Sequence, residues 1–155
     1  MQQKVYLSWK KYIESLNKII NHFQNSNEKF DIIVGLTRGG LIPAVYLSHA
    51  LDTPMIAFNP HSLHADGTPR ENIVLPISPS VIRKILIVDE TSDTGKAFIK
   101  CINFFTKKGF ICKTTSVYIN KKITKFTPDF ALYDSKNKWI VFPYEFYENI
   151  YDKNK

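Results

Sequence analysis

Apolar residues recur either at helical spacing or in continuous runs along the chain, and these two patterns predict its helices and strands. Between residues 9 and 23 they return every three or four positions, with Ser8 placed to cap the first turn, which predicts an amphipathic helix. Continuous apolar runs rich in β-branched residues predict buried strands at 30–35, 54–58, 84–88 and 111–119. Helical stretches are predicted at 41–51, with Pro43 in the first turn, and at 95–108.

The order of these elements predicts the fold class. Strands that alternate with helices are typical of an α/β domain with a mainly parallel central sheet flanked by helices. Weaker strands at 130–133 and 139–142, a short helix after Glu145 and a Lys/Asn-rich tail complete the chain. The many prolines between residues 59 and 80 predict a long surface loop, with room for a short hairpin, that could act as a lid.

The composition is that of one ordinary globular domain. The chain has 155 residues, of which 44% are hydrophobic and 23% charged, so disorder and fibrous structure are excluded. No apolar run is long enough to cross a membrane and no secretory signal is evident, so we expect a cytoplasmic protein. Cys101 and Cys112 lack metal-ligand spacing and are expected to be packing residues.

The net charge of +7 favours anionic partners, either nucleic acid or phosphorylated small molecules. Lysine supplies almost all of the positive charge, and arginine is rare. Because the planar guanidinium group suits phosphate, Arg38 and Arg70, which lie in predicted loops, are candidates for phosphate contacts.

Residues 84–97 combine several features of a phosphate-binding site. An apolar strand ends at Asp89 and Glu90, and Asp93 then precedes a Thr-Gly-Lys triplet that opens a helix. Ligands bind beyond the carboxyl ends of parallel strands, and the free amides of a helix N-terminus hold anions. The two carboxylates would accept hydrogen bonds from sugar hydroxyls or hold magnesium. The segment predicts a ribose 5-phosphate site, although a solvated acidic loop before an ordinary helix would have the same sequence.

Three motifs resemble those of one known family, the type I phosphoribosyltransferases. Residues 85–96 (ILIVDETSDTGK) resemble its signature for phosphoribosyl pyrophosphate, PRPP. Residues 32–43 (IIVGLTRGGLIP) are similar to its pyrophosphate loop. Residues 139–145 (WIVFPYE), together with Ser8-Trp9, resemble the base-binding hood of the 6-oxopurine enzymes, closest to the xanthine-guanine type.

The resemblance implies a purine salvage transferase. Such an enzyme moves the 5-phosphoribosyl group of PRPP to guanine, xanthine or hypoxanthine and releases pyrophosphate, with Mg²⁺ as cofactor. The resemblance also implies the type I phosphoribosyltransferase fold in a single domain over 1–155, with a core at about 28–125 and a hood from about 1–10 and 126–150. It implies a homodimer or homotetramer, with no membrane partner and no nucleic acid.

Roles for individual residues follow from the same resemblance. Asp93 would accept a proton from the imidazole ring of the purine, and Arg38 would stabilise the departing pyrophosphate; these are the catalytic residues. The residues expected to bind PRPP are Thr37, Arg38, Gly39, Gly40, Arg70, Asp89, Glu90, Thr91, Ser92, Asp93, Thr94, Gly95, Lys96 and Ala97. Those expected to bind the base are Asp93, Lys121, Trp139 and Ile140, and those expected to hold the metal are Asp89, Glu90 and Glu145.

Some of these assignments have alternatives. Asp93 could also cap the helix at Gly95, and Trp139 could be a core residue. Asn120 or Lys122 could take the place of Lys121. The resemblance also implies a non-proline cis peptide after Arg38. His61, His64 and Asp66 fit a surface loop better than a metal site.

The chain departs from the family pattern at Ala97, where a hydroxyl residue is usual, and this predicts weaker binding of the 5′-phosphate. Two other functions stay open. One is a regulator of the same fold that senses PRPP or a nucleotide and binds nucleic acid. The other is a phosphoribosyltransferase for a different base.

Overall fold

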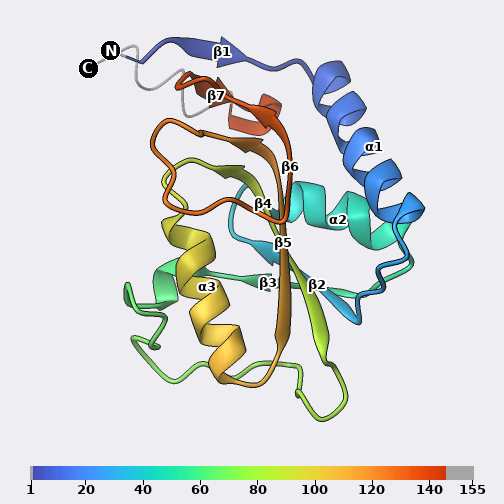
Figure 1. Cartoon of the computed structure of the whole chain (residues 1–155), viewed down its shortest axis with the longest axis vertical. Helices are drawn as coiled ribbons and strands as arrows, with labels where there is room; N and C mark the ends of the chain where they lie inside the picture. Colours follow the sequence, from blue (N-terminus) through green and yellow to red (C-terminus); the bar gives the residue numbers. More distant parts are fainter. Residues whose placement is uncertain (1, 146–155) are drawn as a thin grey trace.

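A parallel sheet of five strands forms the centre of the molecule (Figure 1). The strands, in spatial order, are β3 (Met55–Phe58), β2 (Ile32–Leu36), β4 (Lys84–Ser92), β5 (Ile111–Ile119) and β6 (Phe130–Asp134). Every pairing within this sheet is parallel, which confirms the predicted α/β class. The computed structural model describes residues 2–145, so the helix and tail predicted after Glu145 lie outside the described residues.

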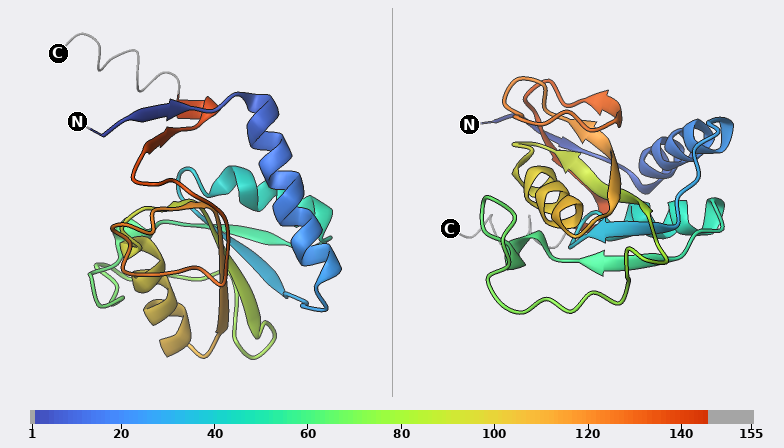
Figure 2. Two further views of the ribbon diagram at one scale, coloured as in Figure 1. Left: turned by 45° about the horizontal axis from the view of Figure 1, so that its top comes forward. Right: turned by 60° about the horizontal axis from the view of Figure 1, so that its bottom comes forward.

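Helices cover both faces of the sheet (Figures 1 and 2). The α1 helix (Trp9–Asn25) and α2 (Leu41–Ala50) pack on one face, and α3 (Lys96–Lys107) packs on the other. Successive side chains of a strand point to opposite faces, so Leu86 and Val88 of β4 meet α1 and α2, whereas Ile85 and Ile87 meet α3. Burial on both faces explains why the strand sequence is continuously apolar.

The first helix begins where the sequence predicts. The Ser8 hydroxyl accepts a hydrogen bond from the Lys11 amide at 3.3 Å, which confirms it as the cap of α1. The buried hydrophobic positions of the helix, spaced three or four residues apart, are Tyr12, Leu16, Ile19 and Phe23. No helix among residues 2–145 is long and apolar enough to span a membrane.

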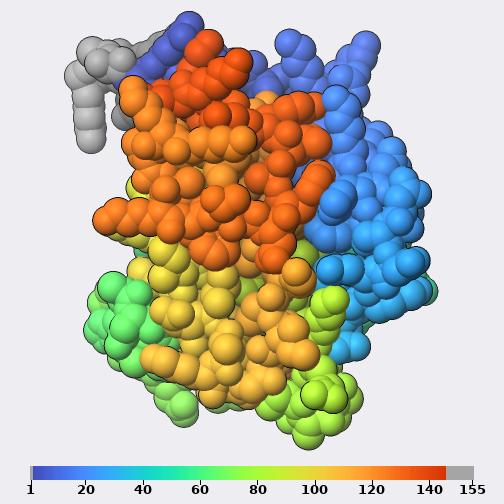
Figure 3. Space-filling view, in the orientation of Figure 1, coloured from blue at the N-terminus to red at the C-terminus, as the bar shows by residue number. Residues whose placement is uncertain are grey.

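The two ends of the described chain meet in a small second sheet. β1 (Lys4–Tyr6) pairs in parallel with β7 (Trp139–Val141), and a 3₁₀ turn, η2 (Pro143–Glu145), follows. Figure 3 shows the red segment that carries β7 packed beside the blue N-terminal segment. Part of the segment expected to form the hood lies in the central sheet, because β6 pairs with β5, with Phe130 opposite Thr115 and Asp134 opposite Ile119.

The β4 strand is longer than its apolar run. It continues to Ser92 instead of ending at Val88, because Thr91 pairs with Tyr118 of β5 and Ser92 pairs with Ile119. Asp89 and Glu90 therefore lie within a strand, and the alternative that they belong to a solvated acidic loop is wrong. A strand backbone holds these carboxylates in place more rigidly than a loop would.

Part of the long connection after β3 packs against the body of the protein. It contains a 3₁₀ turn, η1 (Pro60–Ser62), and a small hairpin closed by a bridge between Leu63 and Pro69, which confirms the predicted hairpin. Leu63 is fully buried and packs in the same core cluster as α3.

The two cysteines have the packing role that was expected of them. Cys101 is buried in α3, Cys112 is half-buried in β5, and both are free thiols. Burial raises the pKa of each thiol, so neither is activated as a nucleophile.

Candidate active site

Two adjoining cavities open at the carboxyl ends of the central strands, where ligands bind in open parallel sheets. The larger has a volume of about 520 Å³ and is lined by Thr37, Arg38, Gly39, Asn59, His61, Glu90, Tyr144 and Glu145. The smaller has a volume of about 110 Å³ and is lined by Glu90, Thr91, Asp93, Ser135, Lys138, Trp139, Ile140, Phe142 and Glu145. Glu90 and Glu145 line both cavities, so the two lie next to each other.

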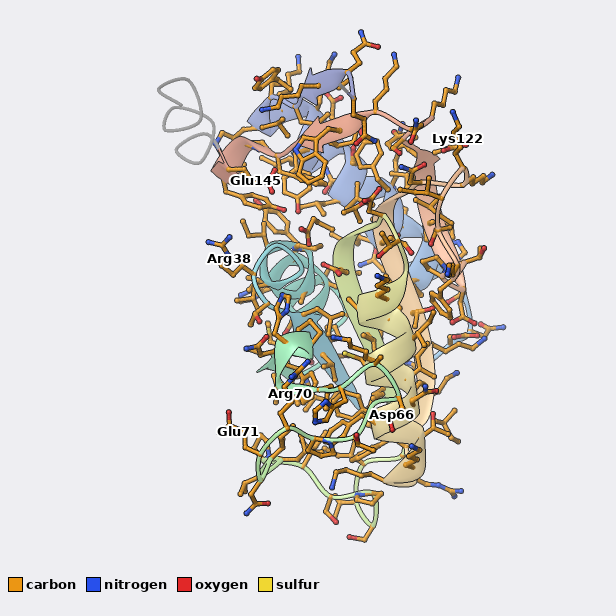
Figure 4. The ribbon with its side chains drawn as sticks, turned by 90° about the vertical axis from the view of Figure 1, so that its left-hand side faces the viewer. Arg38, Asp66, Arg70, Glu71, Lys122 and Glu145 are labelled. Carbon is orange, nitrogen blue, oxygen red and sulfur yellow. The ribbon has the colours of Figure 1, made fainter. Side chains whose placement is uncertain are left out.

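The turn after β2 builds one wall of the larger cavity. Its Thr37 amide donates to the Phe58 carbonyl at 2.9 Å, which ties the turn to β3. The cis peptide lies between Thr37 and Arg38, so the expected position after Arg38 is wrong by one residue. A Cβ at Gly39 would overlap the Glu90 carboxylate, so glycine lets this side chain lie directly against the turn. Arg38 lies on the same side of the molecule as Glu145 (Figure 4).

The acidic pair on β4 is divided between the two faces of the sheet. Glu90 faces the cavities, and its Oε2 atom is buried without a hydrogen-bond partner among residues 2–145. Asp89 lines neither cavity; its Oδ1 accepts a hydrogen bond from the Glu90 amide at 2.9 Å. Burial, and then the negative charge of Glu90, raises the pKa of Asp89 well above its usual range.

The carboxylates leave room for a cation but do not form a complete metal site. Within the described part of the chain, no three His, Cys, Asp or Glu side chains converge to hold an ion. Glu90 and Glu145 nevertheless line the same cavities, and the unpartnered Glu90 oxygen fits a hard cation that takes its other oxygens from a ligand. Glu145 is oriented by the Phe142 amide, which donates to its Oε2 at 2.8 Å.

Asp93 points toward β5 and does not cap α3. Its Oδ1 accepts a hydrogen bond from Asn120 Nδ2 at 2.9 Å. The N-cap of α3 is Gly95, with φ of +76° and no side-chain cap bond, so the helix-cap role considered for Asp93 is wrong. Gly95 serves this left-handed turn and its packing against Phe126.

The predicted phosphate cradle, residues 94–97, lies outside both cavities. The first amides of α3 have no helical acceptor, and that of Lys96 makes a long hydrogen bond, at 3.5 Å, to Thr94 Oγ1. Thr94 and Lys96 are exposed, whereas the Ser92 hydroxyl is buried and is bonded to the Phe126 carbonyl at 3.1 Å. The Ser92 side chain therefore supports the fold.

The smaller cavity brings Asp93 and Trp139 together. Trp139 is 48% exposed, so the alternative that it is a core residue is wrong. Lys121 and its two considered substitutes, Asn120 and Lys122, line neither cavity, and Lys122 lies far from Arg38 and Glu145 in Figure 4. The lysine that does line the smaller cavity is Lys138.

Sequence reasoning missed several residues of the site. Lys138 directly precedes Trp139 and Tyr144 lies inside the hood motif, so their positions in the sequence could have revealed them. Tyr144 donates to the Gly39 carbonyl at 3.4 Å, and burial raises the pKa of its hydroxyl. Ser135 and Asn59 carry no sequence signal; the Ser135 Oγ is buried without a partner among the described residues.

The hairpin after η1 holds two further candidates. His61 lines the larger cavity, while Asp66 accepts hydrogen bonds from Thr68 within its own turn. Arg70 lines neither cavity: its Nε donates to the Leu63 carbonyl at 3.2 Å (Figure 4).

Comparison with known proteins defines the family. The family model of the phosphoribosyl transferase domain matches residues 2–149. The chain therefore belongs to the type I phosphoribosyltransferase family. It is similar to the purine phosphoribosyltransferase of Pyrococcus horikoshii, with 33% identity, a TM-score of 0.76, and coverage of 92% of this chain and 93% of that one.

Further matches include proteins with other functions. The Helicobacter pylori xanthine-guanine-hypoxanthine phosphoribosyltransferase shares the fold, with a TM-score of 0.77 at 21% identity over 97% of this chain and 99% of that one. An orotate phosphoribosyltransferase of Pyrobaculum islandicum is 31% identical over 61% of this chain and 47% of its own. The transcriptional regulator GfcR of Thermoplasma acidophilum is 26% identical over 62% of this chain and 47% of its own. The chain thus spans about half the length of these two relatives.

Proposed function

We propose that this protein transfers the 5-phosphoribosyl group of PRPP to a 6-oxopurine and releases pyrophosphate. The observation that carries the proposal is the adjoining pair of cavities. One presents Arg38 beside open polar space, and the other presents a carboxylate, Asp93, beside an exposed indole, Trp139. The cavity with Arg38 suits the pyrophosphate group, which is a polyanion, and the adjoining cavity with Trp139 suits a flat purine base.

The reaction divides among the residues as follows. The purine nitrogen forms a bond to C1′ of PRPP while the bond from C1′ to the pyrophosphate oxygen breaks. Arg38 and the neighbouring amides take up the charge that develops on the pyrophosphate. The Asp93 carboxylate accepts the proton that leaves the imidazole ring of the base. Trp139 stacks on the base and Ile140 offers its carbonyl group.

Lys138 is the cation that we expect to donate to an exocyclic oxygen of the base. It lines the smaller cavity, whereas Lys121 does not. The neighbouring Ser135 hydroxyl, buried and unpartnered among the described residues, supports a second polar contact to the base.

Magnesium is the expected cofactor. Glu90 and Glu145 would hold it together with PRPP oxygens, and it would neutralise charge on the pyrophosphate when bound. Asp89, on the other face of β4, would then support Glu90 rather than coordinate the ion.

The proposal is tested by pyrophosphate release from PRPP and Mg²⁺, with guanine, xanthine, hypoxanthine, adenine, uracil and orotate supplied separately. We expect release only with the 6-oxopurines. Release with orotate alone would show that the acceptor base is a pyrimidine and not a purine, as it is for the Pyrobaculum orotate phosphoribosyltransferase.

A second candidate is a regulator of the same fold that binds nucleic acid. The similarity to GfcR and the net charge of +7 favour it. PRPP binding without transfer to any base, together with DNA or RNA binding that weakens steeply with salt, would support the regulator instead.

A further inference from the structure

Asn120 is held rigidly beside the carboxylate of Asp93. It follows β5 directly, and its backbone amide donates to the Ser92 carbonyl at 3.0 Å. Its own carbonyl accepts the Thr124 amide at 2.9 Å. The side chain is 0% exposed, and its Nδ2 donates to Asp93 Oδ1 at 2.9 Å. Backbone and burial together leave this amide little freedom to move away from the carboxylate.

The other end of the same amide is unusual. Asn120 Oδ1 is buried and has no hydrogen-bond partner among residues 2–145. A buried acceptor without a donor is costly, and no neighbouring group in the described structure holds the amide in one orientation through that oxygen. The oxygen acquires a donor if Asp93 becomes protonated.

We infer that Asn120 is a positioning residue for the proton transfer at Asp93, one that can hydrogen-bond the carboxyl group in both of its protonation states. This inference rests on the proposed function. Before transfer, Nδ2 donates to the ionised carboxylate. The proton then passes from the ring nitrogen of the base to an Asp93 oxygen, and no other group gains or loses a proton. Asp93 is now a donor, and the Asn120 amide turns about its last side-chain bond to present Oδ1 as the acceptor.

An amide suits this position better than other side chains. Its oxygen and its NH₂ group are almost equal in size, so exchanging them requires no movement of the packed neighbours. A lysine would pair only with the ionised carboxylate, and an aliphatic side chain would pair with neither state. The inference therefore depends on a side chain that is both donor and acceptor, which can be tested.

The test uses two matched pairs of variants at position 120, Asn120→Thr with Asn120→Val, and Asn120→Ser with Asn120→Ala. Within each pair the members differ by one hydroxyl group, which both donates and accepts. We expect kcat to fall about 10–10²-fold in the Val and Ala variants, with KM for PRPP unchanged. Each hydroxyl variant should retain a higher kcat than its partner, although its oxygen lies one bond closer to the backbone than the amide nitrogen of Asn120. The smaller pair gives the same comparison if the β-branched residues prevent folding.

A control residue lies on β5, the strand that leads into Asn120. Thr115→Val removes a buried hydroxyl of β5 that also lacks a partner among the described residues, and it should leave kcat unchanged. Equal loss within each pair, unchanged kcat in the Val and Ala variants, or a loss confined to KM for PRPP would overturn the inference. Wild-type protein assayed alongside separates the two proposals: if it releases no pyrophosphate with any base, the proposed function fails, and the inference fails with it.

Discussion

At the scale of single residues, the proposed proton transfer depends on Asp93. Its carboxylate follows β4, receives a hydrogen bond from Asn120 at 2.9 Å and lines the cavity that contains Trp139. An ionised carboxylate in this place can accept a proton from a bound heterocycle, and an amide of the same shape cannot.

Asp93→Asn is expected to lower turnover by about 10²–10⁴-fold while PRPP binding stays almost intact, because only the proton acceptor is lost. Steady-state kinetics with guanine and a direct PRPP titration measure the two effects. Asp52→Asn, an exposed position at the opposite end of the sheet, is the matched control and should behave as wild type. Undiminished turnover in the Asp93 variant would remove this residue from the mechanism.

Trp139→Ala is expected to raise KM for the base by about tenfold or more, since stacking on an aromatic ring contributes about 1–3 kcal/mol. KM for PRPP should not change, because the indole lines only the smaller cavity. Trp139→Phe preserves a stacking face and should keep most of the affinity. An equal effect of both substitutions would argue against stacking.

At the scale of elements, the site depends on the extension of β4 past its apolar run. The pairing of β4 with β5 carries Glu90 up to the turn after β2, where its carboxylate lies against Gly39. The next glycine, Gly40, lies against the backbone of β4 itself. A Cβ atom added to it would lie 2.5 Å from the Val88 carbonyl oxygen. A Cβ at Gly39 would therefore meet a side chain that can move, whereas a Cβ at Gly40 would meet backbone atoms that cannot.

Substituting each glycine by alanine should separate activity from stability. Gly39→Ala displaces only the end of the Glu90 side chain, so we expect stability within about 0.5 kcal/mol of wild type and turnover lower by about 10–10²-fold. Gly40→Ala meets backbone atoms that cannot move aside, so it should cost about 1–3 kcal/mol of folding free energy. Urea unfolding and pyrophosphate release measure the two quantities; the reverse pattern would contradict this geometry.

Asp129 ties the start of β6 to β5. Its carboxylate accepts hydrogen bonds from Lys113 Nζ at 2.9 Å and from the Thr114 amide and hydroxyl at 2.9 and 2.8 Å. Partial burial raises the pKa of Asp129, but these donors together lower it further, and the resulting pKa lies below the usual range.

Asp129→Asn is expected to lower the free energy of unfolding by about 1 kcal/mol near neutral pH. Because the folded pKa lies below that of the unfolded chain, the stabilisation is complete above about pH 4 to 5 and is lost as the pH falls through the folded value. The difference between wild type and variant, measured by urea unfolding, should be constant from pH 6 to 8 and shrink in acid. A difference that widened in acid would contradict the assignment.

At the scale of the whole molecule, the hydrophobic pattern predicted the architecture but only part of the site. Periodicity is a local property, so it located the helices and most strands, and the three motifs located Arg38, Glu90, Asp93 and Trp139. The length of β4 depends on backbone pairing with β5, which side-chain patterns do not report. The contact between Asp93 and Asn120 joins residues that are 27 positions apart, and no local signal marks it.

Local sequence signals also could not show which lysine, Lys121 or Lys138, lies at the smaller cavity. Both lysines lie in connections, and only the path of the chain after β6 brings Lys138 to the smaller cavity. The loop at 59–80 was predicted as a lid, and the structure shows its hairpin docked on the body with Arg70 bonded to Leu63. Closure of this loop over PRPP and assembly into a dimer or tetramer stay predictions.

The central claim is that one site joins a 6-oxopurine to PRPP. The most direct measurement is a competition in which guanine, xanthine, hypoxanthine, adenine, uracil and orotate are present together at equal concentration with PRPP and Mg²⁺. The nucleoside monophosphates formed are then identified by mass spectrometry, so that product ratios give the ratios of kcat/KM directly. We predict monophosphates of 6-oxopurines alone. A pyrimidine nucleotide as the main product, or no nucleotide from a protein that binds PRPP, would contradict the account.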